Sequence, residues 1–212
     1  KAIDLLDSAC TRTKLDHSDV DKFVTVERIK QELIRATGIK VIAEDETENT
    51  SLVHLEERIN TQVYGQTTAV KKIVDRIILA KSGLARDNKP LAQFLFSGPT
   101  GVGKTETAIT LANELYGGEQ HLITINMSEY QEAHTVSSLK GAPPGYVGYG
   151  QGGVLTEAVR RNPYSVVLLD EIEKAHSDVQ ELFYQVFDKG TLEDGEGRVI
   201  DFKNTTILLT SN

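Results

Sequence analysis

Apolar residues recur along most of the chain at spacings that predict helices alternating with short strands. From Leu52 to Val63, and again from Val70 to Ile78, apolar side chains fall three or four residues apart, as on one face of a helix. Elsewhere they form short uninterrupted runs, which are typical of strands buried on both faces. We expect strands at residues 93–97, 122–126, 165–170 and 205–211, and helices at residues 104–116, 154–161 and 177–188. This order predicts an α/β fold in which a parallel sheet lies between helices.

The amino-terminal part of the chain has a different pattern. Residues 1–14 have helical periodicity, and a second helix is expected to begin after Thr25, a plausible N-cap, and to end at Gly38. The stretch that follows is acidic and polar, which favours a surface linker, although an acidic loop inside a single domain is the alternative. We therefore expect a helical segment at 1–42, an acidic linker at 43–51 and the α/β domain at 52–212. Because Lys1 already lies in a predicted helix, the chain is expected to be part of a longer protein.

The composition restricts the partners that this chain is expected to have. Of 212 residues, 39% are hydrophobic and 25% are charged, which is ordinary for a folded globular protein. The formal net charge of -8 argues against nucleic acid as the main partner. No apolar run approaches the ~20 residues that cross a bilayer, so membrane insertion is not expected. The single cysteine, Cys10, is compatible with a reducing compartment such as the cytoplasm. The five histidines show no metal-ligand spacing.

A glycine-rich loop lies between the first predicted strand and the helix at 104–116. Residues 98–105, GPTGVGKT, fit the pattern G-x-x-x-x-G-K-[ST] in the strand–loop–helix context that this motif requires. Glycines let backbone N–H groups turn toward phosphate oxygens, and the helix presents its positive end to them. Lys104 would reach the β- and γ-phosphates, and the Thr105 hydroxyl would bind Mg²⁺. The loop therefore predicts a site for ATP and Mg²⁺.

Carboxylates and an amide follow two other predicted strands. Asp170 and Glu171 end the apolar run 166–169, where open α/β sheets bind their ligands. We expect Asp170 to help hold Mg²⁺, directly or through water, and Glu171 to polarise the water that attacks the γ-phosphate. Asn212 ends the last predicted strand and could orient the same water; an ordinary loop asparagine is the alternative. These residues favour hydrolysis over transfer to a metabolite.

Together these motifs resemble the Hsp100/Clp family of AAA+ protein unfoldases, and specifically its second ATPase module. The resemblance runs over residues 63–212 and rests on GPTGVGKTE, INMSEY, HTVSSLKGAPPGYVGYGQGG, LLDEIEKAH and LTSN. It implies that residues 52–212 are the large subdomain of that module and residues 1–42 the helical end of the module before it. The nucleotide contacts that it implies are Gly98, Pro99, Thr100, Gly101, Val102, Gly103, Lys104, Thr105 and Glu106, with Val63, Tyr64 and Gln66 against the adenine. The family's arginine finger and second sensor lie beyond Asn212.

Within the family, the chain resembles the ClpV type, the ATPase of type VI secretion systems. The segments LYGGEQHLITINMSEYQEAHTVSSLKG and FDKGTLEDGEGRVIDF carry this likeness. It implies a cytoplasmic homo-hexamer that takes apart the contracted secretion sheath by threading its subunits through a central pore. Before Phe23 there is only a short polar stretch where ClpV-type proteins and disaggregases carry a coiled-coil insertion, so either the chain is ClpA-like at this point or the insertion has been removed or omitted. A ClpA-like or ClpB-like general unfoldase or disaggregase therefore stays open as the alternative.

The resemblance also assigns a role to a glycine-rich segment that contains aromatic residues. In this family, the Gly-Tyr-Val-Gly segment, here residues 145–148, faces the pore. Tyr146 would grip an extended chain through apolar and stacking contacts, and Val147 would add an apolar wedge. Residues 193–198 are a second candidate pore loop, with an ordinary hairpin turn as the alternative. A nucleotide-gated scaffold that does not pull, and a nucleic-acid motor, are the competing functions; the acidic charge counts against the second.

Overall fold

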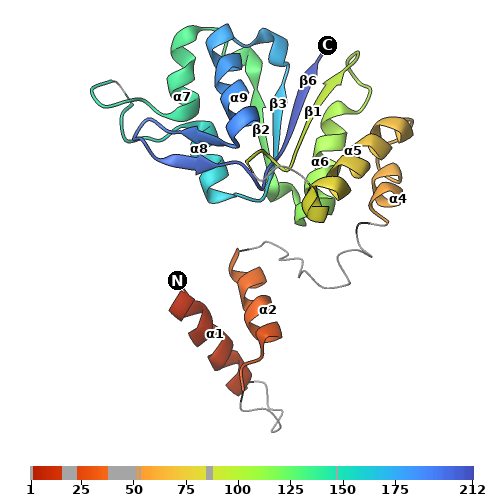
Figure 1. Ribbon diagram of the computed structural model, residues 1–212, viewed down its shortest axis with the longest axis vertical. Helices are drawn as coiled ribbons and strands as arrows, with labels where there is room; N and C mark the ends of the chain where they lie inside the picture. Colours follow the sequence, from red (N-terminus) through yellow and green to blue (C-terminus); the bar gives the residue numbers. More distant parts are fainter. Residues whose placement is uncertain (1, 16–22, 38–51, 53, 85–87, 147) are drawn as a thin grey trace. The chain divides into compact units, whose positions relative to one another are not determined.

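The computed structural model describes residues 2–15, 23–37, 52, 54–84, 88–146 and 148–212 (Figure 1). Its contacts divide into two compact units, residues 1–50 and 51–212. The linker predicted at 43–51 lies outside the described residues. The boundary between the domains therefore stays a prediction.

The first unit is a pair of helices, α1 (Ala2–Leu15) and α2 (Val26–Thr37). Thr25 caps α2 as expected, because its hydroxyl accepts the backbone N–H of Arg28 at 3.3 Å. The buried carboxylate of Glu32 joins the two helices by accepting Arg12 Nε at 3.2 Å and Arg35 Nη1 at 2.9 Å. Among the described residues of this unit, Ala9 is the only buried apolar side chain.

The second unit is built on a parallel sheet with the strand order β1-β6-β3-β2. The strands are β1 (Ala92–Ser97), β2 (Leu122–Asn126), β3 (Val166–Asp170) and β6 (Thr206–Ser211). Ser97 pairs with Ser211, and Asn126 pairs with Asp170. The carboxyl ends of the strands therefore meet along one edge of the sheet, which is where ligands bind in open α/β folds.

Helices cover both faces of this sheet, as the apolar runs predicted (Figure 1). One face carries α4 (Leu55–Asn60), α5 (Thr67–Leu79) and α6 (Lys104–Tyr116). The other carries α7 (Val136–Lys140), α8 (Val154–Arg161) and α9 (Ser177–Lys189). Side chains of β3 alternate between them: Val166 and Leu168 belong to the first core, and Val167 and Leu169 to the second. The predicted α/β sandwich is confirmed.

Smaller elements connect these layers. An antiparallel hairpin, β4 (Thr191–Glu193) and β5 (Val199–Asp201), adds its buried Leu192 and Ile200 to the core under α9. The remaining short elements are a π-helix at Ala80–Leu84 and 3-10 helices at Glu119–His121, Met127–Glu129, Ala133–Thr135 and Ile172–Lys174. Of the helices that the structure describes, none has the length and apolar character needed to cross a membrane.

Candidate active site

The predicted phosphate loop joins β1 to α6 at the carboxyl edge of the sheet. Gly101 and Gly103 have φ angles of 85° and 94°, in the left-handed region that favours glycine. Gly103 is also the N-cap of α6, so the loop runs directly into the positive end of a helix of 13 residues. A Cβ atom at position 101 would meet nothing within 4 Å, so this glycine is needed for its backbone conformation rather than for lack of space.

Lys104 ties the phosphate loop to the end of the neighbouring strand β6. Its Nζ donates to Gly98 O at 2.5 Å, to Ser211 O at 3.1 Å and to Asn212 Oδ1 at 2.6 Å. All three acceptors are neutral oxygens. An anionic phosphate oxygen within reach would be a stronger acceptor for this ammonium group, because hydrogen bonds between ionised groups are the stronger ones.

Asp170 and Glu171 are held at the end of β3 by one buried hydroxyl. The Oγ1 of Thr210 donates to Asp170 Oδ1 at 2.5 Å and accepts the backbone N–H of Glu171 at 2.9 Å. Glu171 has φ 58° and ψ 50°, a left-handed conformation that turns its side chain away from the direction of the strand. Thr210 is buried in β6, so the position of both carboxylates depends on the pairing of β3 with β6.

Asn212 links the two halves of the site. Because β6 lies between β1 and β3, the residue after β6 sits between the phosphate loop and the carboxylates. Its Oδ1 accepts Lys104, and its Nδ2 donates to Glu171 Oε1 at 3.4 Å. The other oxygen of Glu171, Oε2, accepts Lys174 Nζ at 2.7 Å. The predicted catalytic residues Lys104, Asn212 and Glu171 therefore form one continuous chain of contacts.

Hydrogen bonds shift the pKa of two charged side chains at this edge of the sheet. The hydrogen bond with Glu171 raises the pKa of Lys174 above its ordinary value. Hydrogen bonds from its own backbone N–H and from the backbone N–H of Asn212 lower the pKa of Glu173. The carboxylate of Glu173 also anchors the end of the chain here, since its Oε1 accepts the N–H of Asn212 at 3.2 Å.

The donor and acceptor groups fit a nucleotide phosphate with Mg²⁺. The loop supplies a left-handed glycine backbone, a helix N-terminus and an ammonium group for the phosphates. Thr105 is exposed in the first turn of α6, and Asp170 is half-buried at the end of β3. Among the described residues, no three His, Cys, Asp or Glu side chains are grouped to hold a metal by themselves. An ion held by one or two protein oxygens, with phosphate and water completing the shell, is the usual arrangement for Mg²⁺.

The residues predicted to lie against adenine do not share one environment. Gln66 reaches the loop, because its Nε2 donates to Val102 O at 3.1 Å. Val63 is buried and lies close to Gly103, where an added Cβ would be 3.9 Å from Val63 Cγ1. Tyr64 is 82% exposed. Gln66 and the loop residues Gly98, Pro99 and Val102 share a pocket of about 320 Å³ that α5 and β1 complete. Tyr64 does not line this pocket.

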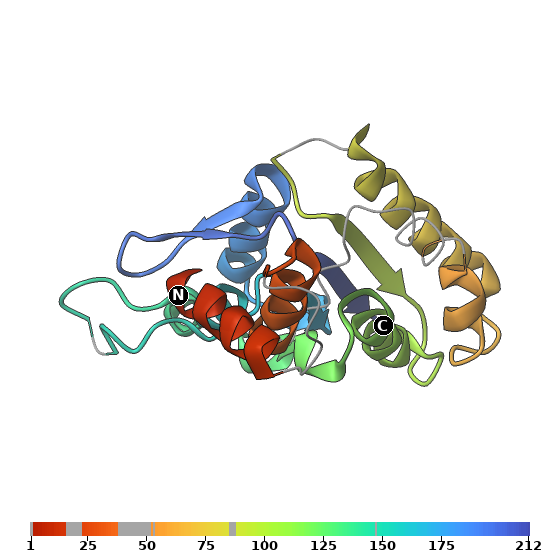
Figure 2. The ribbon, with the colours of Figure 1, turned by 90° about the horizontal axis from the view of Figure 1, so that it is seen from below.

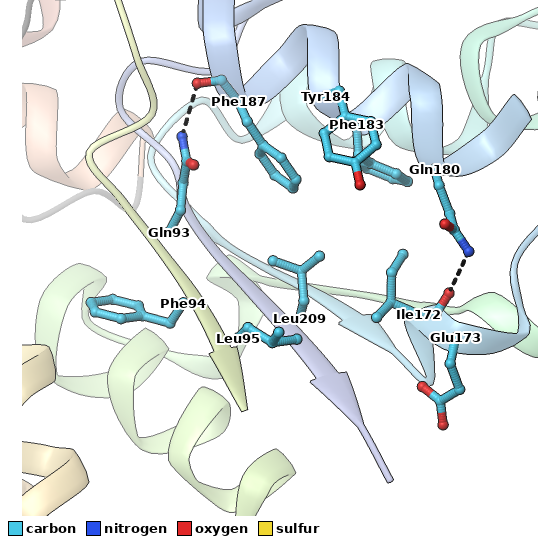
Figure 3. A pocket seen from close by; sticks show the side chains of 10 residues that line it. All are labelled: Gln93, Phe94, Leu95, Ile172, Glu173, Gln180, Phe183, Tyr184, Phe187 and Leu209. Atoms are coloured by element: carbon cyan, nitrogen blue, oxygen red, sulfur yellow. Dashed lines mark hydrogen bonds between the residues drawn. The ribbon is translucent and has the colours of Figure 1, made fainter. Parts of the chain in front are cut away.

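A second, more apolar hollow lies on the opposite side of β1, beneath α9 (Figure 3). Phe183, Tyr184 and Phe187 face Leu95 and Leu209 across it. Gln93 Nε2 donates to Phe187 O at 3.1 Å, and Gln180 Nε2 donates to Ile172 O at 3.4 Å. The phosphate loop contributes no residue to this hollow, and Leu95 lines both the hollow and the candidate nucleotide pocket.

The predicted pore residues lie in a long glycine-rich loop, 141–153, between α7 and α8. Tyr146 is 71% exposed, and its backbone N–H donates to Pro143 O at 3.2 Å, within a turn of the loop. Its ring is therefore not packed in the core of the domain. Val147 lies outside the described residues. The second candidate, residues 193–198, is the turn of the β4–β5 hairpin.

Sequence reasoning missed Thr210. It is one of three hydroxyl residues in the strand TILLTS, so nothing in the sequence distinguishes it from Thr206 and Ser211. Lys174 and Glu173 were also missed, because charged residues after a strand are typical of an ordinary solvated turn. Only the pairing of β3 with β6 brings Thr210 to the Asp170–Glu171 pair.

We expect Thr210→Val to destabilise the fold and slow nucleotide turnover. Valine keeps the shape but leaves the Glu171 N–H without its hydroxyl acceptor, and such a loss costs about 1–3 kcal/mol. The matched variant Thr210→Ser keeps the hydroxyl and should retain most of the activity. Thermal midpoints and ATP turnover of the three full-length proteins test this; equal values for Val and Ser would contradict the role of the hydroxyl.

Comparisons with known proteins identify the family of this chain. The family model of the AAA domain (Cdc48 subfamily) matches residues 89–212. The chaperone protein ClpB of Yersinia enterocolitica is 65% identical over 176 residues, and the AAA+ ATPase ClpV1 of Pseudomonas aeruginosa is 62% identical over 176 residues. Each alignment covers 83% of this chain and 20% of the relative. The chain therefore spans about a fifth of the length of these relatives.

The solved structures include a close match in fold. A closed-state cryo-EM reconstruction of Hsp104 with ATPγS and FITC casein superposes with a TM-score of 0.77 at 39% sequence identity. The match covers 99% of this chain and 36% of that chain. The parallel sheet with helices on both faces is thus an arrangement found in Hsp104.

Proposed function

We propose, on the premise that the chain belongs to the AAA domain family (Cdc48 subfamily) and within it to the Hsp100/Clp group of AAA+ ATPases, that it acts in an ATP-driven motor that remodels other proteins. One observation carries this proposal: the contacts from Lys104 through Asn212 to Glu171 connect a phosphate loop to a carboxylate. Such a connection suits a site in which a bound phosphate and an attacking water must be held at a fixed separation.

Each residue of the site then has a role in ATP hydrolysis. Residues 98–106 hold the triphosphate, with Lys104 on its β- and γ-phosphates. Gln66 stabilises this loop through its hydrogen bond to Val102 O. Thr105 and Asp170 hold Mg²⁺, which when bound neutralises charge on the phosphate oxygens. Glu171 accepts a proton from the attacking water, and Asn212 orients that water. Val63 and Tyr64 remain candidates for the adenine side of the site.

Tyr146 and Val147 are proposed to contact the protein that is pulled. An exposed tyrosine on a glycine-rich tether offers a large apolar ring without demanding a particular partner sequence. Nucleotide binding and hydrolysis would shift the populations of loop positions, which converts turnover into movement. We propose that this happens in the pore of a cytoplasmic homo-hexamer, with a polypeptide as partner rather than nucleic acid or membrane.

The substrate that we propose is the contracted sheath of a type VI secretion system. The 62% identity to ClpV1 and the segments described above support this choice. A general disaggregase of the ClpB kind is the second candidate, because the identity to ClpB is of the same size, at 65%. The Hsp104 structure contains FITC casein, and this supports a general protein substrate as much as a sheath.

The ATPase rate of the full-length protein separates these functions. With contracted sheath tubules we expect hydrolysis to rise several-fold and the tubules to shorten, whereas unfolded casein should have little effect. Equal stimulation by casein would favour the general disaggregase. Hydrolysis with no remodelling of either protein would contradict the motor and favour a nucleotide-gated scaffold.

A further inference from the structure

Two exposed loops of the ATPase unit meet at a backbone contact that only glycine permits. We define the aromatic loop as residues 141–153 and the hairpin turn as residues 193–198. We propose that they move as one unit, because Gly195 locks the tip of the turn onto the base of the aromatic loop. Figure 2 shows both segments projecting from the same end of the domain. The consequence for pulling rests on the proposed function, but the joint itself does not.

The joint is a direct contact between two main chains. The backbone N–H of Gly195 donates to Lys140 O at 2.9 Å. A Cβ atom at position 195 would lie 2.6 Å from both the carbonyl oxygen of Ala142 and the carbonyl carbon of Gly141. Real Cβ atoms essentially never come this close to other heavy atoms. The two loops therefore touch with no room for a side chain between them.

Gly195 is required for this contact and not for its backbone conformation. Its φ lies outside the positive range, unlike that of Gly197 in the same turn, where φ is 80°. An alanine would therefore be tolerated at position 195 if the aromatic loop were not there. Glycine is therefore required at position 195 because the aromatic loop packs against it, and not because of the backbone conformation.

A second glycine closes the base of the aromatic loop in the same way. Gly153 has an ordinary φ of -89°, yet a Cβ there would overlap the carbonyl oxygen of Leu139. Gly141, across from it, would place a Cβ 3.2 Å from the Gly195 nitrogen and 3.3 Å from the Gly153 nitrogen. The two ends of the loop and the tip of the turn thus meet at three glycine backbones.

The joint has a rigid support on the hairpin side. Leu192 and Ile200 pair across the hairpin and are buried beneath α9. Asp194 closes the turn, since its Oδ1 accepts the backbone N–H groups of Glu196 at 2.9 Å and Arg198 at 2.8 Å. A well-anchored turn that is bonded to Lys140 will carry the base of the aromatic loop with it.

This arrangement fixes how a substrate would meet the two loops. Tyr146 presents an aromatic ring, whereas the hairpin turn presents Glu196 and Arg198, which are both exposed. If the two segments move together, the base of the aromatic loop keeps a constant offset from the charged turn during each stroke. Gly195 is then a positioning residue that acts through the main chain.

The test compares Gly195→Ala with Gly197→Ala in the full-length protein. Both variants add one methyl group to the same turn. At position 197 it makes only an ordinary contact, at 3.6 Å from Glu193 Oε1, but the positive φ there strains an alanine, so this variant controls for strain in the turn. Amide hydrogen exchange is measured with ATPγS bound. For Gly195→Ala we expect roughly tenfold faster exchange in residues 141–153, as for the loss of a hydrogen-bonded contact. Gly197→Ala should leave that loop unchanged.

The exchange of α6 peptides reports on folding and should stay near wild type in each variant. Unchanged exchange of the aromatic loop in Gly195→Ala would overturn the proposal. Equal acceleration by both variants would also overturn it, because turn strain and not the joint would then be the cause. A protein that hydrolyses ATP but remodels nothing would contradict the proposed function alone, since the exchange experiment still decides whether the joint exists.

Discussion

The full-length Glu171→Gln protein is expected to bind ATP stably and to hydrolyse it orders of magnitude more slowly than the wild type. The amide of glutamine matches the carboxylate in size but cannot accept a proton from water. Removing such a general base costs about 10²–10⁴-fold in rate. The contact between Asn212 Nδ2 and Oε1 can persist. The amide NH2 then replaces the oxygen that accepts Lys174 Nζ, so that hydrogen bond is lost.

Two measurements check this result. Binding of a fluorescent ATP analogue should be retained, while phosphate release should fall. The control variant Glu181→Gln removes a carboxylate from the exposed side of α9 and should leave both unchanged. Wild-type turnover in Glu171→Gln would contradict the role of Glu171, and loss of nucleotide binding would mean that the substitution had disturbed the site instead.

Tyr146→Ala is expected to keep ATP hydrolysis and to lose the remodelling of protein substrates. The side chain is 71% exposed, so its truncation removes a contact surface without opening a cavity in the core. An aromatic ring buries 150–250 Å² against a partner, and most of this contact is lost with alanine. Tyr146→Phe keeps the ring and should retain most of the activity.

Sheath disassembly and ATP turnover are measured side by side for these variants. Tyr184→Ala is the matched control, because that tyrosine is equally exposed but lies on α9. Disassembly at the wild-type rate in Tyr146→Ala would exclude a grip by this ring. A parallel loss in Tyr184→Ala would point to a general effect of removing surface tyrosines.

Local signals in the sequence were sufficient to predict the fold class. Helix α6 was predicted to run from Lys104 to Tyr116, and it does, because glycines with positive φ stand at both ends, at Gly103 and Gly117. The run 166–169 predicted a strand buried on both faces, and its four apolar residues are all buried. Such signals depend on neighbours within one element, which the sequence displays directly.

The order of the strands in the sheet could not be predicted from the sequence. An apolar run does not reveal which other run it pairs with, so the place of β6 between β1 and β3 had to come from the structure. The contacts of Thr210 and the bridging position of Asn212 both depend on that order. Gly195 shows the same limit, since in the sequence it is indistinguishable from a turn glycine. The predicted roles of the individual site residues stay predictions.

The backbone of Glu171 has a consequence for any attempt to engineer this protein. Of the described non-glycine residues, it alone has a positive φ, a conformation that costs L-residues about 1–2 kcal/mol. Glycine or asparagine would relieve that strain, so a search for thermostable variants would favour them at position 171. Either substitution removes the carboxylate. Under the proposed function, heat resistance and turnover therefore impose opposite demands on this one residue.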